Sequence, residues 1–232
     1  MKEFKHACFI SYRNGSVVQG KREPVPDLLN EFTRCLKEAL TSEFRAMLTP
    51  HLDEPVFLDG NSLHLGDYIE ENIADALCHS ACMILVYTPN YFDERKTFCA
   101  REYLAMKKRE AYCKERKGKH NTNKSLIFTL ILRGSEDRIP NELGNSVYEN
   151  FNFFYPKTRI EHTRNYKDKI KAIANEIAEL YNNFIQYENR HQVKFCEVCA
   201  DFALPIISEK GENIKAFITR MKAQDTPDYP SI

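Results

Sequence analysis

The segment from Pro55 to Met106 constrains the fold more than any other part of this chain. A short apolar run, Val56 to Leu58, stops at Asp59, and a polar loop then extends to Gly66-Asp67. An amphipathic helix, an apolar run at Cys82 to Tyr87 and a second helix follow. Strand, loop, helix, strand and helix in this order predict a parallel α/β fold. In such folds the loops at the carboxyl ends of the strands form the ligand-binding crevice.

The rest of the chain supplies the other elements of a five-stranded parallel sheet with helices on both faces. Apolar residues recur every fourth position from Leu28 to Leu48, which predicts an amphipathic helix. Arg13 to Pro26, with Asn-Gly and two prolines, is expected to be a long loop. The expected strands are Cys8 to Tyr12, Val56 to Leu58, Cys82 to Tyr87, Ser125 to Leu132 and a short edge strand at Asn150 to Tyr155; the later helices are expected at Ile69 to Leu77, Thr97 to Lys117 and Ile170 to Phe184.

Length and composition favour one domain with an extension. We divide the 232 residues into a domain at 1–188 and a C-terminal extension at 189–232, expected to pack on the domain or on a partner chain. Hydrophobic residues make up 43% of the chain, but no apolar run approaches the roughly 20 residues needed to cross a bilayer. The N-terminus has no long apolar signal region, and formal net charge is zero. We therefore expect a cytoplasmic protein that binds neither membrane nor nucleic acid.

The eight cysteines are scattered, and several lie inside apolar segments, which is typical of reduced core thiols. Only Cys196 and Cys199 form a tight pair, with His191 five residues upstream. This pair is either half of a zinc site or two cysteines on the buried side of a helix. No second pair follows it, so we favour the buried helix and predict no metal site.

Three motifs in order resemble those of the TIR (Toll/interleukin-1 receptor/resistance) domain. The first is a strand ending in Phe9-Ile10-Ser11-Tyr12, followed by Arg13. The second is a strand ending at Asp59 and a loop closing on Leu65-Gly66-Asp67. The third is Phe98-Cys99-Ala100-Arg101-Glu102, with Phe where the family has Trp. The resemblance covers about residues 5 to 185 and implies a flavodoxin-like fold.

The family implies two kinds of function. Many animal TIR domains are adaptors that join through the loop after the second strand. Many bacterial and plant members, and one animal neuronal enzyme, hydrolyse or cyclise NAD+ with the glutamate of the third motif, which this chain keeps as Glu102. A near-solitary TIR domain is similar to the TIR proteins of Thoeris-type anti-phage systems, whose nucleotide product switches on a separate effector. The resemblance therefore favours an NAD+ glycohydrolase or ADP-ribosyl cyclase in immune signalling.

One carboxylate can suffice for this reaction. Glycoside cleavage commonly needs a second carboxyl group to protonate a poor leaving group. Nicotinamide leaves NAD+ as a neutral ring, so no acid is required, and positive charge grows on the ribose. A fixed anion beside the ribose stabilises that charge and can hold the sugar hydroxyls. We assign this role to Glu102; the alternative is a solvent-exposed helix glutamate.

The residues expected to bind NAD+ as substrate, with no cofactor or metal, lie in the same three motifs. Arg13 suits phosphate oxygens, although it can also be a surface arginine. Tyr68 matches a family position beside the base, although it can also be a core aromatic. Cys99 shares a helix face with Glu102 and is expected to pack rather than attack. The substrate-binding set is Ser11, Tyr12, Arg13, Asp59, Leu65, Tyr68, Phe98 and Cys99.

Within this set Asp59 is expected to fix its loop more than to touch ligand. His64 stands where some family enzymes carry an acidic residue, which argues against a second catalytic carboxylate. The Phe98 ring keeps an apolar contact but lacks an indole N–H.

Two other functions stay open. The chain can be a non-enzymatic interaction module with the 59–67 loop as its docking surface, or a related α/β enzyme such as a nucleoside deoxyribosyltransferase. TIR enzymes tend to complete their site between protomers, which implies self-association of this chain through the 59–67 loop.

Overall fold

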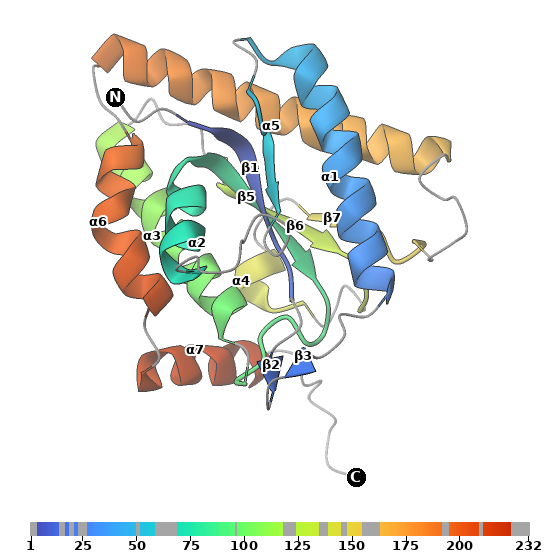
Figure 1. The fold of residues 1–232 in the computed structure, drawn as a ribbon, viewed down its shortest axis with the longest axis vertical. Coiled ribbons are helices and arrows are strands. Elements are labelled where there is room, and N and C mark those ends of the chain that lie inside the picture. The colour runs from blue at the N-terminus through green and yellow to red at the C-terminus, as the bar shows by residue number, and fades with distance from the viewer. Residues whose placement is uncertain are drawn as a thin grey trace.

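The computed structural model describes residues 4–13, 17–18, 21–22, 27–49, 52–58, 69–95, 97–117, 124–134, 139–144, 148–154, 163–191, 195–208 and 211–223. Within these ranges five parallel strands form one sheet, as predicted, and the structure gives their order as β4-β1-β5-β6-β7 (Figure 1). The strands are β1 (His6–Ser11), β4 (Val56–Leu58), β5 (Ser80–Tyr87), β6 (Ile127–Ile131) and β7 (Tyr148–Asn150).

The central strands are buried on both pleat faces. Every residue of β1, β5 and β6 is buried, which explains why their sequences are nearly continuous apolar runs. At the carboxyl end of the sheet, Ile10 lies level with Leu58 of β4 and Ser11 lies level with Leu85 of β5. Ser11 is thus the last residue of a central strand and lies at the carboxyl edge of the sheet.

Helices cover both faces of the sheet (Figure 1). One face carries α1 (Asp27–Met47) and α5 (Arg164–His191), which contact each other, and the other carries α2 (Ile69–Cys78) and α3 (Phe98–Lys117). The predicted apolar stripe of α1 is buried, including Phe32, Leu36, Leu40 and Phe44. This packing holds the helices against the sheet and leaves its carboxyl edge to the loops that follow the strands.

The C-terminal extension forms a further helical layer. Helix α6 (Phe195–Ser208) contacts α2 and α3, and α7 (Glu212–Ala223) contacts α3. Helix α5 continues to His191, slightly past the boundary drawn at residue 188. The extension therefore packs on its own domain in this structure.

Two local expectations were wrong. The predicted loop at residues 13–26 contains a small antiparallel pair, β2 (Val17–Val18) and β3 (Lys21–Arg22). The edge strand lies at Tyr148–Asn150 rather than at 150–155. The chain turns after Asn150 because the rings of Phe151 and Phe154 both pack on Phe32, with centroid separations of 5.2 and 5.1 Å. A four-residue helix, α4 (Asn141–Gly144), precedes β7.

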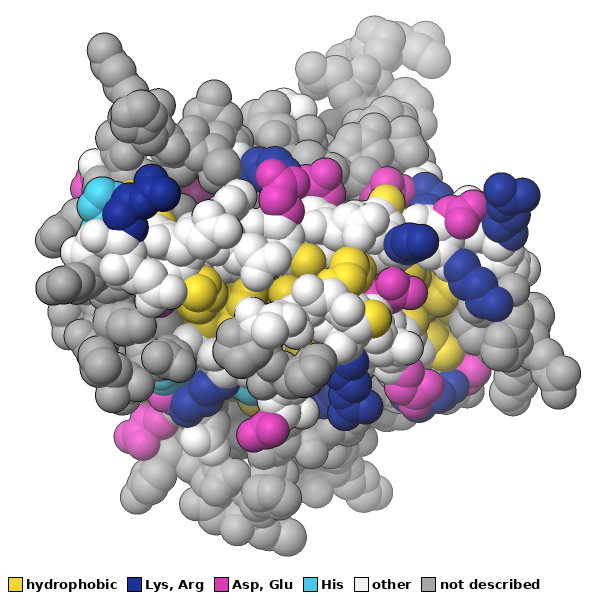
Figure 2. Space-filling view, turned by 90° about the horizontal axis from the view of Figure 1, so that it is seen from above, with side chains coloured by type: hydrophobic (Ala, Val, Ile, Leu, Met, Phe, Trp, Pro, Cys, Tyr) yellow, Lys and Arg dark blue, Asp and Glu magenta, His cyan; other side chains and the backbone are white. Residues whose placement is uncertain are grey.

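One face of the molecule shows described side chains of both charges. Figure 2, seen from the top of Figure 1, shows a band of hydrophobic side chains across the middle, with side chains of both charges around it. Among the helices that the structure describes, none combines the length and the apolar character needed to cross a bilayer.

Candidate functional site

The candidate site lies where the sheet changes winding direction. From β1 the chain passes through α1 to β4 on one side, and from β5 it passes through α3 to β6 on the other. The carboxyl ends of β1 and β5 are neighbours, so the loops that leave them diverge to opposite faces. In open α/β sheets this switch point is where ligands bind.

Three buried side chains meet at this point. The Ser11 hydroxyl donates to Glu102 Oε2 at 2.5 Å, and Ser11 Oγ lies 2.5 Å from the Tyr91 hydroxyl. Ser11 comes from the end of β1, Tyr91 from the loop after β5 and Glu102 from the first turns of α3. Their exposed fractions are 1%, 0% and 2%. The interpretation of Glu102 as a solvent-exposed helix residue is therefore wrong.

The order of donors in this cluster follows from its chemistry. Ser11 has one hydroxyl hydrogen and gives it to the Glu102 carboxylate, so the phenol of Tyr91 must donate to Ser11 Oγ. Burial raises the pKa of Tyr91 well above its usual value, and the nearby Cys99 and Glu102 raise it further. Tyr91 therefore stays neutral and remains a donor. The hydrogen-bond chain therefore runs from the Tyr91 phenol through the Ser11 hydroxyl to Glu102 Oε2.

Cys99 and Tyr12 are two further buried residues, each adjacent to or near a member of this cluster in the chain. The Cys99 thiol donates to the carbonyl oxygen of Tyr12 at 3.4 Å. The exposed fractions of Cys99 and Tyr12 are 4% and 8%. A buried thiol that donates to a carbonyl packs as a neutral group, in line with the expectation that Cys99 is not a nucleophile.

Arg13 is held by a carboxylate in the same region. Its guanidinium forms an ion pair with Asp93 at 2.9 Å, and the side chains are 21% and 12% exposed. Burial alone would raise the pKa of Asp93, but the hydrogen bond from the Arg95 N–H and the charges of Arg13 and Arg95 lower it below its ordinary value. Arg13 is therefore a partly buried cation, oriented by Asp93 just beyond the carboxyl end of β1, rather than a free surface arginine.

Phe98 lies under the guanidinium of Arg101, which sits 3.9 Å from the ring centroid. Arg101 also donates to the carbonyl oxygen of Ile207 in α6, and it lies 3.5 Å from Glu70 of α2. The first turn of α3 is thus fixed from outside by α6, while Glu102 reaches inward to Ser11. The structure places Phe98 in this supporting contact.

Three predicted site residues, Asp59, Leu65 and Tyr68, lie outside the described residues, as does His64. The structure brings together Ser11, Tyr12, Cys99 and Glu102 as the motifs predicted, and it places Arg13 beside Asp93. Two site residues were missed, Tyr91 and Asp93. The available signal was their position directly after an apolar central strand, where polar side chains reach the crevice edge.

Of the cysteine pair in the extension, Cys199 has a described side chain. Cys199 is buried and hydrogen-bonds with Cys78 of α2, while the Cys196 side chain lies outside the described part. Within the described ranges no group of His, Cys, Asp and Glu residues is placed to hold a metal ion.

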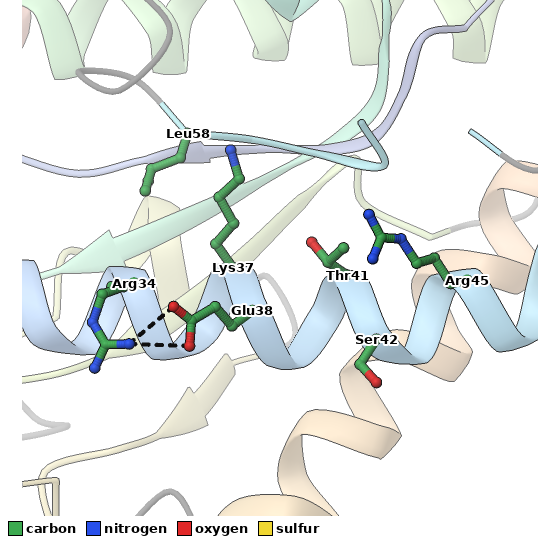
Figure 3. A pocket seen from close by; sticks show the side chains of 7 residues that line it. All are labelled: Arg34, Lys37, Glu38, Thr41, Ser42, Arg45 and Leu58. Atoms are coloured by element: carbon green, nitrogen blue, oxygen red, sulfur yellow. Dashed lines mark hydrogen bonds and ion pairs between the residues drawn. The ribbon is translucent and has the colours of Figure 1, made fainter. Parts of the chain in front are cut away.

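A separate hollow of about 500 Å³ lies along α1 (Figure 3). Its basic side chains are largely paired, because Arg34 donates to Glu38 at 2.9 and 3.0 Å and Lys37 lies 2.9 Å from Glu54. The described lining is Arg34, Lys37, Glu38, Thr41, Ser42, Arg45 and Leu58. This open hollow lacks a buried catalytic group, so the Ser11–Tyr91–Glu102 cluster is the stronger candidate.

Comparison of the chain with protein-family models, with curated proteins and with solved structures finds no match. The resemblance of the three motifs, the fold and the geometry of the buried Ser11–Tyr91–Glu102 cluster therefore carry the functional argument.

Proposed function

We propose that this chain is a TIR-type enzyme that cleaves the nicotinamide–ribose bond of NAD+, with Glu102 as the catalytic carboxylate. The product would be ADP-ribose or a cyclic or conjugated form of it, acting as a signal to a separate effector in anti-phage defence. The defence role rests on the resemblance to Thoeris-type TIR proteins.

The observation that carries the proposal is the position of one carboxylate. Glu102 is 2% exposed, lies at the switch point of the sheet and accepts a hydrogen bond from Ser11. A carboxylate is seldom buried without a structural or chemical reason. An anion fixed in a low-dielectric crevice stabilises a growing positive charge more strongly than one in water.

The proposed reaction uses that anion without a partner acid. Nicotinamide is cationic when bound to the ribose and leaves neutral, taking the electron pair of the C1–N bond. The ribose then carries oxocarbenium-like charge, which Glu102 stabilises until water or another nucleophile attacks C1. Proton transfer to the leaving group is not needed, which fits a cluster whose other members are neutral donors.

Arg13 is proposed to contact the pyrophosphate. Its guanidinium is oriented by Asp93 at 2.9 Å, and a planar guanidinium matches phosphate oxygens. Substrate phosphate would compete with Asp93 or share the cation with it. The predicted 59–67 loop is proposed to close the site and to mediate self-association.

The test is nicotinamide release by the purified full chain, measured by chromatography at several protein concentrations. Glu102→Gln is expected to lower turnover at least about 100-fold. Glu110→Gln is the matched control, because Glu110 is a second buried glutamate of α3, 4% exposed, and lies two turns further along the helix. Full turnover by Glu102→Gln would show that Glu102 is not the catalytic carboxylate. If the wild type released no nicotinamide, the proposed NAD+ cleavage would be wrong.

A non-enzymatic interaction module is the second candidate. It is favoured by the ion pair of Arg13 with Asp93, which already neutralises the cation proposed for the phosphates. This alternative expects Gly66→Pro to abolish partner binding and Glu102→Gln to leave the biological response intact.

A further inference from the structure

The segment from Tyr91 to Glu94 faces two parts of the molecule alternately. Tyr91 hydrogen-bonds with Ser11, and Asp93 forms an ion pair with Arg13. The intervening Phe92 and the following Glu94 instead contact α7 of the C-terminal extension. One short segment therefore joins the candidate site to the last described helix.

The contact with α7 is mainly aromatic. The Phe217 ring lies 5.7 Å from that of Phe92 and 5.8 Å from that of Tyr103, and Phe92 and Tyr103 also contact each other at 5.9 Å. Lys222 lies 3.6 Å from Glu94, but both side chains are about half exposed, so this ion pair contributes little. Burial of Phe217 is what holds the segment against α7.

We infer that Tyr91 is a positioning residue for the proposed reaction, acting on Glu102 through Ser11, and that α7 holds Tyr91 in place. This inference rests on the proposed function. In this inference, the C-terminal extension keeps the loop after β5 in the conformation that orients the Glu102 carboxylate.

The physical reason is the series of donors. The Ser11 hydroxyl gives its single hydrogen to Glu102, and the Tyr91 phenol donates to the Ser11 oxygen. Without the phenol, the Ser11 hydroxyl keeps its acceptor but loses the contact that holds its oxygen in place, so its bond to Glu102 weakens. The carboxylate would then be held less firmly, and its charged form would be favoured less.

Other described groups also act on this site. Arg101 interacts electrostatically with Glu102, and Cys99 and Tyr103 act on Tyr91. None of them donates to Ser11 among the described hydrogen bonds, so removal of the Tyr91 phenol is a specific test.

Tyr91→Phe tests the first half of the inference. We expect kcat to fall about fivefold to tenfold with little change in KM, the loss expected for one hydrogen bond. Ser11→Ala should cost more, because it removes the bond to Glu102 directly. The matched control is Tyr181→Phe, a buried tyrosine that packs on Phe4 at the opposite end of the sheet and should leave kcat unchanged. Equal kcat in Tyr91→Phe and wild type would overturn the inference.

Phe217→Ala tests the second half. Its kcat should fall as in Tyr91→Phe, while Phe217→Leu, which keeps an apolar side chain, should retain most of it. Amide exchange at Tyr91, whose N–H donates to Thr88 at 2.8 Å, should accelerate in Phe217→Ala only. Lys215→Ala on an exposed position of α7 is the control. If Phe217→Ala changed neither the amide exchange at Tyr91 nor kcat, the inference that α7 holds Tyr91 in place would be wrong.

A readout without catalysis separates this inference from the proposed function. In protein labelled with carbon-13 at glutamate carboxyls, the Glu102 signal is identified by its loss in Glu102→Gln. Its titration midpoint should move to higher pH in Tyr91→Phe and stay in place in Tyr181→Phe. If the wild type releases no nicotinamide but this shift occurs, the function fails and the positioning stands. If turnover occurs but Tyr91→Phe changes neither midpoint nor kcat, the positioning fails and the function stands.

Discussion

The two ends of the sheet carry the same kinds of groups in opposite environments. At the carboxyl end, Glu102 is 2% exposed and accepts a hydrogen bond from Ser11. At the amino end, the Asp75 side chain is 45% exposed, interacts with His79 and forms an ion pair with Lys5 at 2.9 Å. The Glu102 carboxylate accepts a hydrogen bond from a neutral hydroxyl inside the protein, whereas the Asp75 carboxylate forms an ion pair with a lysine near water.

This difference separates a fold-stabilising carboxylate from a candidate catalytic one. The hydrogen bond with His79 lowers the pKa of Asp75, burial opposes this, and Lys5 lowers it further. Its charge is thus already neutralised by its neighbours. The Ser11 hydroxyl is a neutral donor, so its hydrogen bond orients the Glu102 carboxylate without cancelling its charge. The first three experiments below compare a change at one end with a change at the other, and the fourth concerns the amino end alone.

Glu102→Asp should give the largest effect. It keeps the charge but withdraws the carboxylate by one methylene, so we expect NAD+ turnover to fall about 100-fold. Asp75→Asn should leave turnover unchanged. Turnover of both variants is measured as nicotinamide release. Similar turnover in the two would contradict the claim that Glu102 is catalytic and Asp75 is not.

Arg13→Ala should act mainly on substrate binding. Loss of a charge-assisted contact to phosphate is expected to raise KM about tenfold, with a smaller change in kcat. Lys5→Ala, which removes the cation of the amino-end pair, should change neither constant. Steady-state kinetics over a range of NAD+ concentrations decide this, and an unchanged KM in Arg13→Ala would exclude Arg13 from the substrate site.

Stability should also distinguish the ends. Glu102→Leu leaves the Ser11 hydroxyl without its buried acceptor, so the free energy of unfolding should fall by about 1–3 kcal/mol. Asp75→Leu removes a half-exposed ion pair and should cost less than about 1 kcal/mol. Urea denaturation of both variants at pH 7 measures the two losses. If Asp75→Leu lost as much unfolding free energy as Glu102→Leu, or more, the claim that the buried cluster stabilises the fold more than the exposed pair would be wrong.

The smallest expected effect is a pH dependence at the amino end. Burial lowers the pKa of His6, with its hydrogen bond to the Glu54 carbonyl acting in the opposite direction. The unfolded chain then binds this proton more readily, so stability falls as pH drops below about 6.5. His6→Gln should lose less stability than wild type between pH 7 and pH 5, and a larger loss would reverse the assigned sign.

Most of the fold could be predicted from the sequence, because the pattern of apolar residues is local. The strand at Val56–Leu58 has the predicted bounds, since the apolar run ends at Asp59. The edge strand was misplaced because Asn150 to Tyr155 alternates like a strand, whereas the burial of Phe151 and Phe154 against Phe32 depends on a distant helix.

The candidate site was predicted only in part. Glu102, Ser11 and Arg13 came from motifs, but the sequence does not show that Glu102 is buried or that Asp93 pairs with Arg13. Tyr91 could not be assigned because its role depends on a hydrogen bond across 80 positions of the chain. The contact of α7 with Phe92 likewise arises only from packing.

The central claim is that the Glu102 carboxylate breaks the bond between nicotinamide and ribose. Mass spectrometry of NAD+ after incubation with concentrated wild-type protein and with Glu102→Gln tests it most directly. The account predicts nicotinamide and an ADP-ribose-derived product in equal amounts from the wild type and neither from the variant. Intact NAD+ in both samples, or equal cleavage in both, would contradict it.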